Sequence, residues 1–127
     1  APGFLPNYSG YRNLKFLADI KRVIGKQEIY AAMKTVGLDP DNGKHVGKYS
    51  LGMRQRLGLA QAIMENPSIL ILDEPMNGLD RKGVEEMRDL LVSFREQGKT
   101  VLLASHNRED IDILCDTVQE MEDGSFL

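Results

Sequence analysis

Apolar residues recur at helical spacing through the first half of the chain, which predicts three helices. The first begins after Ser9, whose hydroxyl can cap a helix, and ends at Gly25. The second ends at Gly37, before a turn-forming segment rich in Asp, Asn, Pro and Gly. The third begins after Ser50 and ends at Asn66, because a residue before proline avoids the helical conformation. The apolar positions of these helices are Leu14, Leu17, Ile20 and Ile24, then Ile29, Met33 and Val36, then Met53, Leu57, Ala60 and Met64.

After residue 66 the pattern changes to alternating strands and helices. Residues 69–72 are four consecutive branched aliphatic residues, which is typical of a parallel strand buried on both faces. A helix with apolar positions from Val84 to Phe94 follows and ends at Gly98, before a second strand over residues 100–104. A short helix near residues 111–114, a strand over 117–121 and a hairpin turn at 123–124 complete the chain. The pattern predicts an α/β protein with a helical part, residues 1–65, and a parallel sheet part, residues 66–127.

Composition narrows the classes of function. The 127 residues are 42% apolar and 28% charged, which suits one globular domain with a modest core. A net charge of −3 argues against binding nucleic acid. No apolar run approaches the roughly 20 residues that cross a bilayer, so we expect no membrane insertion. Cys115 is the only cysteine, which fits a reducing compartment. Because the chain begins at Ala1 without a methionine, we expect it to be a fragment of a longer protein.

Reactive side chains follow both predicted strands. Asp73 and Glu74 come directly after the first strand, and Ser105 and His106 after the second. Ligands of parallel sheets bind beyond the carboxyl ends of the strands. In phosphoryl transfer, Asp73 would hold Mg²⁺ and Glu74 would activate a water, a contribution of about 10²- to 10⁴-fold. His106 would contact the γ-phosphate. Each feature also has a plain interpretation, a polar strand end for the two acids and a structural histidine for His106.

A second candidate site lies at the start of the third predicted helix. Helix N-termini present free N–H groups and partial positive charge, so Ser50 is positioned to bind an anion. Gly52 would allow close approach of a ligand to the backbone. Taken alone, this segment is equally typical of an ordinary serine cap.

Four motifs in order resemble those of ABC (ATP-binding cassette) ATPases. Residues 49–57, Tyr-Ser-Leu-Gly-Met-Arg-Gln-Arg-Leu, resemble the signature motif, and residues 69–75, Ile-Leu-Ile-Leu-Asp-Glu-Pro, resemble Walker B. Residues 77–80, Asn-Gly-Leu-Asp, resemble the D-loop, and residues 105–106 resemble the switch histidine. The resemblance covers nearly the whole chain from Pro2 onward, and four ordered motifs are far more specific than any one of them.

The resemblance implies a partial P-loop NTPase-like fold, a three-layer parallel sheet with an α-helical subdomain. Residues 1–65 would be the subdomain that ends in the signature helix, and residues 66–127 the distal part of the RecA-like ATPase core. The implied ligands are ATP and Mg²⁺. Asp73 is the implied metal ligand and Glu74 and His106 are the implied catalytic residues. The nucleotide-binding residues are Ser50, Leu51, Gly52, Met53 and Asp80.

The implied protein is the ATP-hydrolysing subunit of a transporter. In this family two nucleotide-binding domains enclose ATP at their interface, where Asp80 would lie, and the signature residues face the partner's nucleotide. The helical part would dock on transmembrane permease subunits. The implied location is cytoplasmic, peripheral on the inner face of the membrane. The variant signature and the early Pro2-Gly3-Phe4 resemble the branch that exports peptide antibiotics, bacteriocins or drugs.

Two departures from the family pattern affect these expectations. The usual signature, Leu-Ser-Gly-Gly-Gln, has Tyr, Leu and Met here at its first, third and fifth positions, so its glutamine contact is lost. No Gly-x-x-x-x-Gly-Lys-Ser/Thr loop, the Walker A motif, occurs in the sequence. Residues 43–49 resemble this motif but do not match it, because their two glycines are one residue closer to each other than the motif requires. By family order, Walker A and the Q-loop would precede Ala1, so we expect this chain alone to be inactive.

Two alternatives remain open at this stage. The chain could belong to an ABC-type ATPase without a transport role, although no heptad run typical of such relatives is present. It could also be a non-catalytic module that lends its signature helix to an active partner. The presence of Asp73, Glu74 and His106 together favours the catalytic interpretation.

Overall fold

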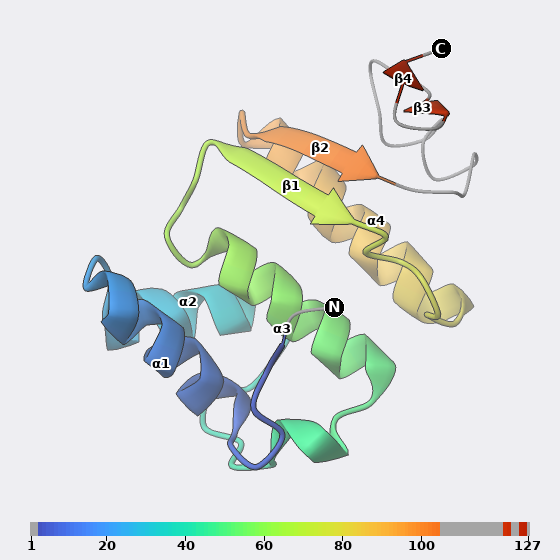
Figure 1. Cartoon of the computed structure of the whole chain (residues 1–127). Coiled ribbons are helices and arrows are strands. Elements are labelled where there is room, and N and C mark those ends of the chain that lie inside the picture. Colours follow the sequence, from blue (N-terminus) through green and yellow to red (C-terminus); the bar gives the residue numbers. More distant parts are fainter. Residues whose placement is uncertain (1–2, 105–120, 123–124, 127) are drawn as a thin grey trace.

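Helices make up the first half of the chain, and a parallel pair of strands joined by a long helix follows (Figure 1). This computed structural model describes residues 3–104, 121–122 and 125–126. The helices are α1 (Gly10–Lys21), α2 (Lys26–Thr35), the 3-10 helix η1 (Val46–Lys48), α3 (Leu51–Ile63) and α4 (Arg81–Glu96). The strands are β1 (Ile69–Asp73), β2 (Thr100–Ala104), β3 (Met121–Glu122) and β4 (Ser125–Phe126).

Two predicted serine caps are confirmed. The Arg12 N–H donates to Ser9 Oγ (3.2 Å) at the start of α1, and the Met53 N–H donates to Ser50 Oγ (3.1 Å) at the start of α3. Each hydroxyl satisfies a backbone donor that has no partner within its helix. The local sequence therefore fixed where both helices begin.

The predicted end of the first helix was wrong. Helix α1 ends at Lys21 because Arg22 adopts a left-handed conformation (φ 55°), with its N–H donating to the Ala18 carbonyl. Gly25 is instead the N-cap of α2. Ile20, which the apolar spacing places on the buried face of this helix, is 79% exposed. A left-handed cap on a non-glycine residue gives no clear sequence signal, so the spacing of apolar residues extended the helix too far.

The core lies where α1, α2 and α3 pack together and continues beneath the sheet to α4. Leu14, Ile29 and Leu57 are fully buried in it.

Among the described residues, Asn13 is the only buried residue that is polar or charged, and its amide holds the segment before α1. Its Oδ1 accepts from the Leu5 N–H (2.6 Å) and its Nδ2 donates to the Ser9 carbonyl (2.9 Å). The remaining core residues are Ala18, Ala32, Met33, Val36, Leu38, Val46, Tyr49, Leu59, Ala60, Met64, Leu70, Met76, Met87, Leu91 and Phe94.

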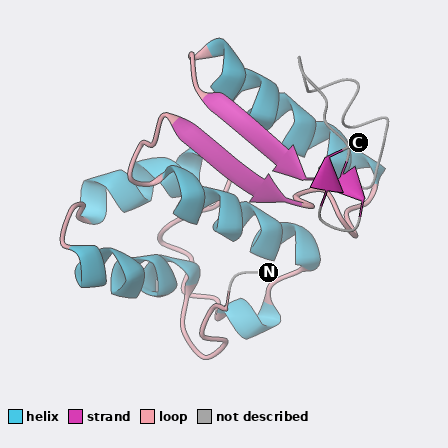
Figure 2. Cartoon of the chain, turned by 45° about the horizontal axis from the view of Figure 1, so that its top comes forward, coloured by secondary structure: helices cyan, strands magenta, loops and turns pink. Residues whose placement is uncertain are grey.

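Strands β1 and β2 pair in parallel, from Ile69 beside Thr100 to Asp73 beside Ala104. Helix α3 contacts β1 and α4 contacts β2 (Figure 2). Leu70 is buried, whereas Ile71 is 75% exposed and Leu102 51% exposed. The prediction of a first strand buried on both faces was therefore wrong for the structure described. Its side chains alternate between a covered and an open face, because the helices that contact the sheet cover one face only.

The end of the chain contains the predicted hairpin. Strands β3 and β4 pair antiparallel, with Met121 beside Phe126 and Glu122 beside Ser125. The predicted helix near residues 111–114 and most of the strand predicted over 117–121 lie outside the described residues.

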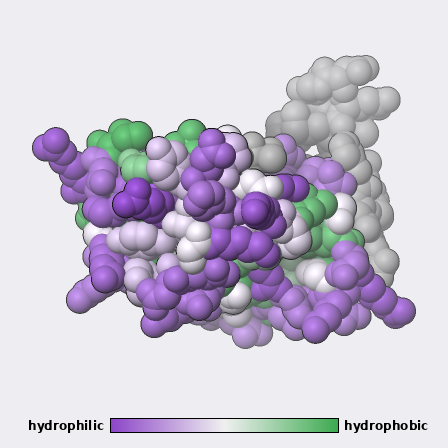
Figure 3. Space-filling view, turned by 90° about the horizontal axis from the view of Figure 1, so that it is seen from below, coloured by the Kyte–Doolittle hydropathy of each residue, from purple (hydrophilic) through white to green (hydrophobic). Residues whose placement is uncertain are grey.

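The face seen in Figure 3 is mostly hydrophilic, with small apolar areas. Among the residues that the structure describes, no helix combines the length and the apolar character that a membrane span requires.

Candidate functional site

The carboxyl ends of β1 and β2 bring the two predicted acids to one edge of the sheet. Asp73 is the last residue of β1, lies beside Ala104 and is exposed. Glu74 follows and is partly buried. Its N–H donates to the Ala104 carbonyl (2.7 Å), which ties the two strand ends together. The sequence prediction that Asp73 and Glu74 stand at this edge is thus confirmed. Ser105 and His106 continue from β2 but lie outside the described residues.

Glu74 has an unusual backbone conformation. Its φ is +47°, a left-handed value that costs a non-glycine residue on the order of 1–3 kcal/mol. The following Pro75 disfavours the ordinary helical alternative and is itself buried, as is Met76. Such strain persists only where the surrounding structure enforces it, and it is concentrated at functional sites. The conformation of Glu74 therefore adds a structural indication of function to the one that its position gives.

The start of α3 presents backbone N–H groups at an exposed surface. Ser50 and Leu51 are exposed, and Gly52 and Met53 are partly buried. A Cβ built on Gly52 would meet its nearest neighbours at 3.7 and 3.9 Å, an ordinary contact distance, so internal packing does not require glycine there. The missing side chain leaves this helix N-terminus open to a ligand, and the helix dipole favours an anion.

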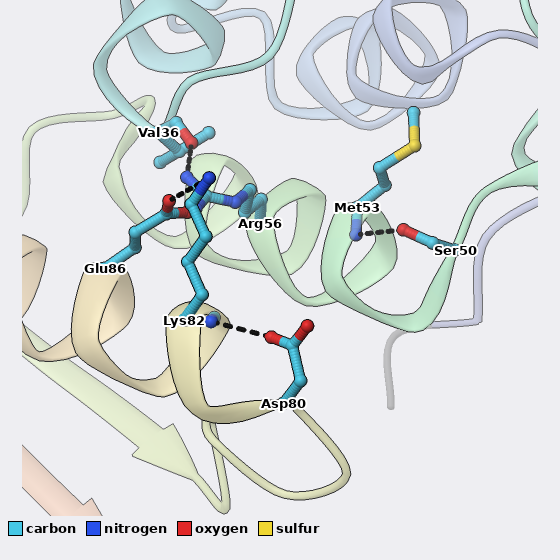
Figure 4. Close-up of polar contacts among 8 residues, drawn as sticks. Val36, Ser50, Met53, Arg56, Asp80, Lys82 and Glu86 are labelled. Atoms are coloured by element: carbon cyan, nitrogen blue, oxygen red, sulfur yellow. Dashed lines mark hydrogen bonds and ion pairs between the residues drawn. The ribbon is translucent and has the colours of Figure 1, made fainter.

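Asp80 caps the next helix. Its Oδ1 accepts from the Gly83 N–H (2.8 Å) at the start of α4. Figure 4 shows the Asp80 side chain pointing toward the first turn of this helix. The structure thus gives Asp80 a local role, and its carboxylate is exposed.

Arg56 joins three helices, a role that no motif in the sequence predicts. Its Nη1 donates to the Val36 carbonyl (2.6 Å) after α2, and its Nη2 pairs with Glu86 on α4 (Figure 4). The sequence signal that could have drawn attention to Arg56 is a cation beside the apolar face of a predicted helix. This contact fixes α3, which Ser50 caps, relative to α4, which Asp80 caps.

Tyr49, directly before Ser50, is buried against α1. Its hydroxyl lies so close to Gly10 that a Cβ on that glycine would overlap it. Burial raises the pKa of the Tyr49 phenol, and a hydrogen bond with the Gly10 backbone opposes that shift. This tyrosine thus anchors the segment before α3 to the helical core.

The donor set suits a nucleotide with Mg²⁺. Among the described residues, no group of three or more His, Cys, Asp or Glu side chains could hold a metal ion. Magnesium at phosphate sites usually takes only one or two carboxylates, with water and phosphate oxygens as its other ligands. An exposed Asp73 at a strand end fits that mode. The open helix N-terminus at Ser50 is a separate feature, of the kind that binds phosphate in other proteins.

This α/β architecture, with carboxylates at a strand end and an open helix N-terminus, places the chain in the P-loop NTPase-like class. The family model described as ABC transporter matches residues 2–77. The chain belongs to the ABC transporter family.

The similar proteins include two relatives and one solved structure. The chain is 46% identical to the uncharacterized ABC transporter ATP-binding protein YybJ of Bacillus subtilis, over 94% of this chain and 55% of that protein. It is 43% identical to the bacitracin transport ATP-binding protein BcrA of Enterococcus faecalis, over 99% of this chain and 41% of that protein. The structure of cbiO1 from Clostridium perfringens, part of the ABC transporter complex cbiONQ, matches with a TM-score of 0.78. Its identity is 30%, over 98% of this chain and 51% of that one. The chain spans about half the length of the curated relatives it matches.

Proposed function

We propose that this chain is the distal part of an ATP-hydrolysing subunit that drives transport through membrane partners. The observation that carries the proposal is the pair Asp73 and Glu74 at the carboxyl end of a parallel strand, with Glu74 held at a positive φ. A phosphoryl-transfer site needs one carboxylate for a metal and a second for a water, at fixed positions.

Each site residue has a role in this proposal. Asp73 holds Mg²⁺, which neutralises charge on the phosphates when it is bound. Glu74 accepts a proton from the attacking water, and His106 contacts the γ-phosphate. The signature residues bind the nucleotide of a second nucleotide-binding domain, and Asp80 lies at the interface between the two domains. The signature residues are Ser50, Leu51, Gly52 and Met53.

The two parts of the chain have different functions in this proposal. Residues 1–65 are the helical subdomain that docks on a transmembrane permease, and residues 66–127 belong to the ATPase core. The subunit works at the cytoplasmic face of the membrane. The similarity to a bacitracin transport protein supports export of a peptide antibiotic or a related compound. An ABC-type ATPase without transport remains the alternative, and the 43% identity to a transport protein favours the transport function.

Glu74→Gln in the complete protein that carries this chain tests the proposed base. Turnover of ATP should fall by about 10²-fold or more because the amide cannot accept the proton, while ATP-dependent dimerisation should persist. The matched control is Glu85→Gln, which changes an exposed glutamate on α4. Retained turnover in Glu74→Gln would remove Glu74 from this role.

The same assay tests the chain without a phosphate-binding loop. The 127 residues contain no Gly-x-x-x-x-Gly-Lys-Ser/Thr sequence, so we expect them to show no ATP turnover by themselves. Magnesium-dependent turnover by this chain alone would contradict the assignment of the nucleotide site.

A further inference from the structure

The first turn of α3 and the loop between β1 and α4 are packed against each other. Leu51 covers Gly78 so closely that a Cβ on this glycine would overlap the leucine Cδ2. Leu79 lies over Gly52, 3.7 Å from where a Cβ would stand. Gln55 Nε2 donates to the Asn77 carbonyl (3.2 Å). One tight contact between Leu51 and Gly78, one looser approach of Leu79 to Gly52 and one hydrogen bond therefore join the signature segment to the D-loop of the same chain.

The loop that receives these contacts leads directly to Glu74. The Asn77 N–H donates to the Glu74 carbonyl (3.1 Å), and the Leu79 N–H donates to the Met76 carbonyl (3.2 Å). Gly78 adopts φ +77°, a conformation that allows the tight turn. Residues 74–79 thus form a continuous hydrogen-bonded turn. A displacement at Gly78 would be transmitted to the backbone of Glu74, whose own left-handed conformation depends on its surroundings.

Leu51 has no major role in the core. It remains 42% exposed, while α3 is anchored by Leu57 and Ala60, which are fully buried. Truncating Leu51 should therefore leave the helix folded and affect mainly the contact with Gly78. This separation lets a role in positioning be measured apart from a role in stability.

We infer that Leu51 and Gln55 are positioning residues, which fix the turn at residues 77–79 and thereby the orientation of Glu74. This role rests on the proposed function of Glu74 as the base. In consequence, the segment that binds one nucleotide is mechanically linked, within a single chain, to the base that acts on the other nucleotide. The leucine at this signature position, where the family usually has glycine, is the side chain that makes the link.

The test compares Leu51→Ala and Gln55→Ala with the wild type in the complete protein that carries this chain. Without nucleotide, hydrogen exchange at the Asn77 and Leu79 amides should become faster, because the turn loses its outer support. With ATP and Mg²⁺, kcat should fall by about 10- to 100-fold while KM changes little. The base is displaced, whereas the backbone N–H of residue 51 and the other signature residues still bind the nucleotide. Leu51→Met, which keeps a long apolar side chain, should show the hydrogen exchange and the kcat of the wild type. Leu5→Ala, which truncates a leucine of similar exposure (48%) far from the loop in sequence, is the control.

Two results would overturn the inference. One is unchanged exchange at Asn77 and Leu79 in Leu51→Ala. The other is a rise in KM with kcat unchanged, which would mean that the Leu51 side chain contacts the nucleotide and does not position Glu74. If the wild type shows no ATP turnover at all, the proposed function fails, and hydrogen exchange alone decides whether Leu51 and Gln55 hold the turn.

Discussion

The helical half and the sheet half of the molecule bury their apolar residues to different extents. In the helical half, Leu14, Ile29 and Leu57 have no exposed surface, because three helices supply each other with apolar faces. In the sheet half, Ile69 and Ile71 keep 54% and 75% of their surface exposed, although they stand in the most apolar run of the chain. The comparison shows that apolar character does not bury a residue unless a second element packs against that face.

The two halves also hold their functional residues differently. Ser50 is placed by a helix cap and by the buried Tyr49 before it. Glu74 is placed by backbone hydrogen bonds to Ala104 and Asn77 and by its own positive φ. Because the apolar residues of the helical core are buried and those of the open sheet face are not, substitutions in the core should lower the free energy of unfolding most. Substitutions on the open sheet face should lower it least.

The largest loss of stability is expected for Leu57→Ala in the helical core. Removing a fully buried leucine side chain should lower the free energy of unfolding by about 2–5 kcal/mol, through lost burial and the cavity left behind. Urea unfolding of the chain measures this change. Leu102→Ala, on the open face of the sheet, is the matched control and should lose much less. Equal losses in the two variants would contradict the comparison.

An intermediate effect is expected for Arg56→Ala, at the junction of the two halves. Loss of the guanidinium leaves the Val36 carbonyl and Glu86 without this donor and should lower stability by about 1–3 kcal/mol. Arg81→Ala is the control, because the Arg81 side chain is almost fully exposed and pairs loosely with Glu85 (3.8 Å). Urea midpoints that are the same for both variants would show that Arg56 does not join the halves.

The smallest effect is expected for Ile71→Thr on the open sheet face. Threonine keeps the β-branched shape that strands prefer, so the free energy of unfolding should change by no more than about 0.5 kcal/mol. Val36→Thr, which places a hydroxyl at a fully buried position, should cost considerably more. A large loss in Ile71→Thr alone would mean that the exposed face is covered in solution.

Much of the fold was predictable because its signals are local. The caps at Ser9 and Ser50 follow from side-chain chemistry, and the strand at residues 100–104 was predicted with its observed bounds. The end of α1 was not predictable, because Arg22 takes a left-handed cap without glycine. The contact of Arg56 with Glu86 joins residues 30 positions apart, and no local pattern predicts such a partner.

The candidate site divides in the same way. The order of strand, Asp73 and Glu74 predicted two carboxylates at a sheet edge, and the parallel pairing of β1 with β2 confirmed it. The interlocking of Leu51 with Gly78 was not predictable, because it depends on how α3 lies against the loop before α4.

The sequence by itself determined that helices begin after Ser9 and Ser50, which runs form strands and which side chains follow the strand ends, because these depend on neighbours within a few positions. Only the tertiary structure decided which strand face is covered, which helices Arg56 joins and what conformation Glu74 adopts. These features depend on residues that are distant in sequence, and their energies arise only when the elements pack together.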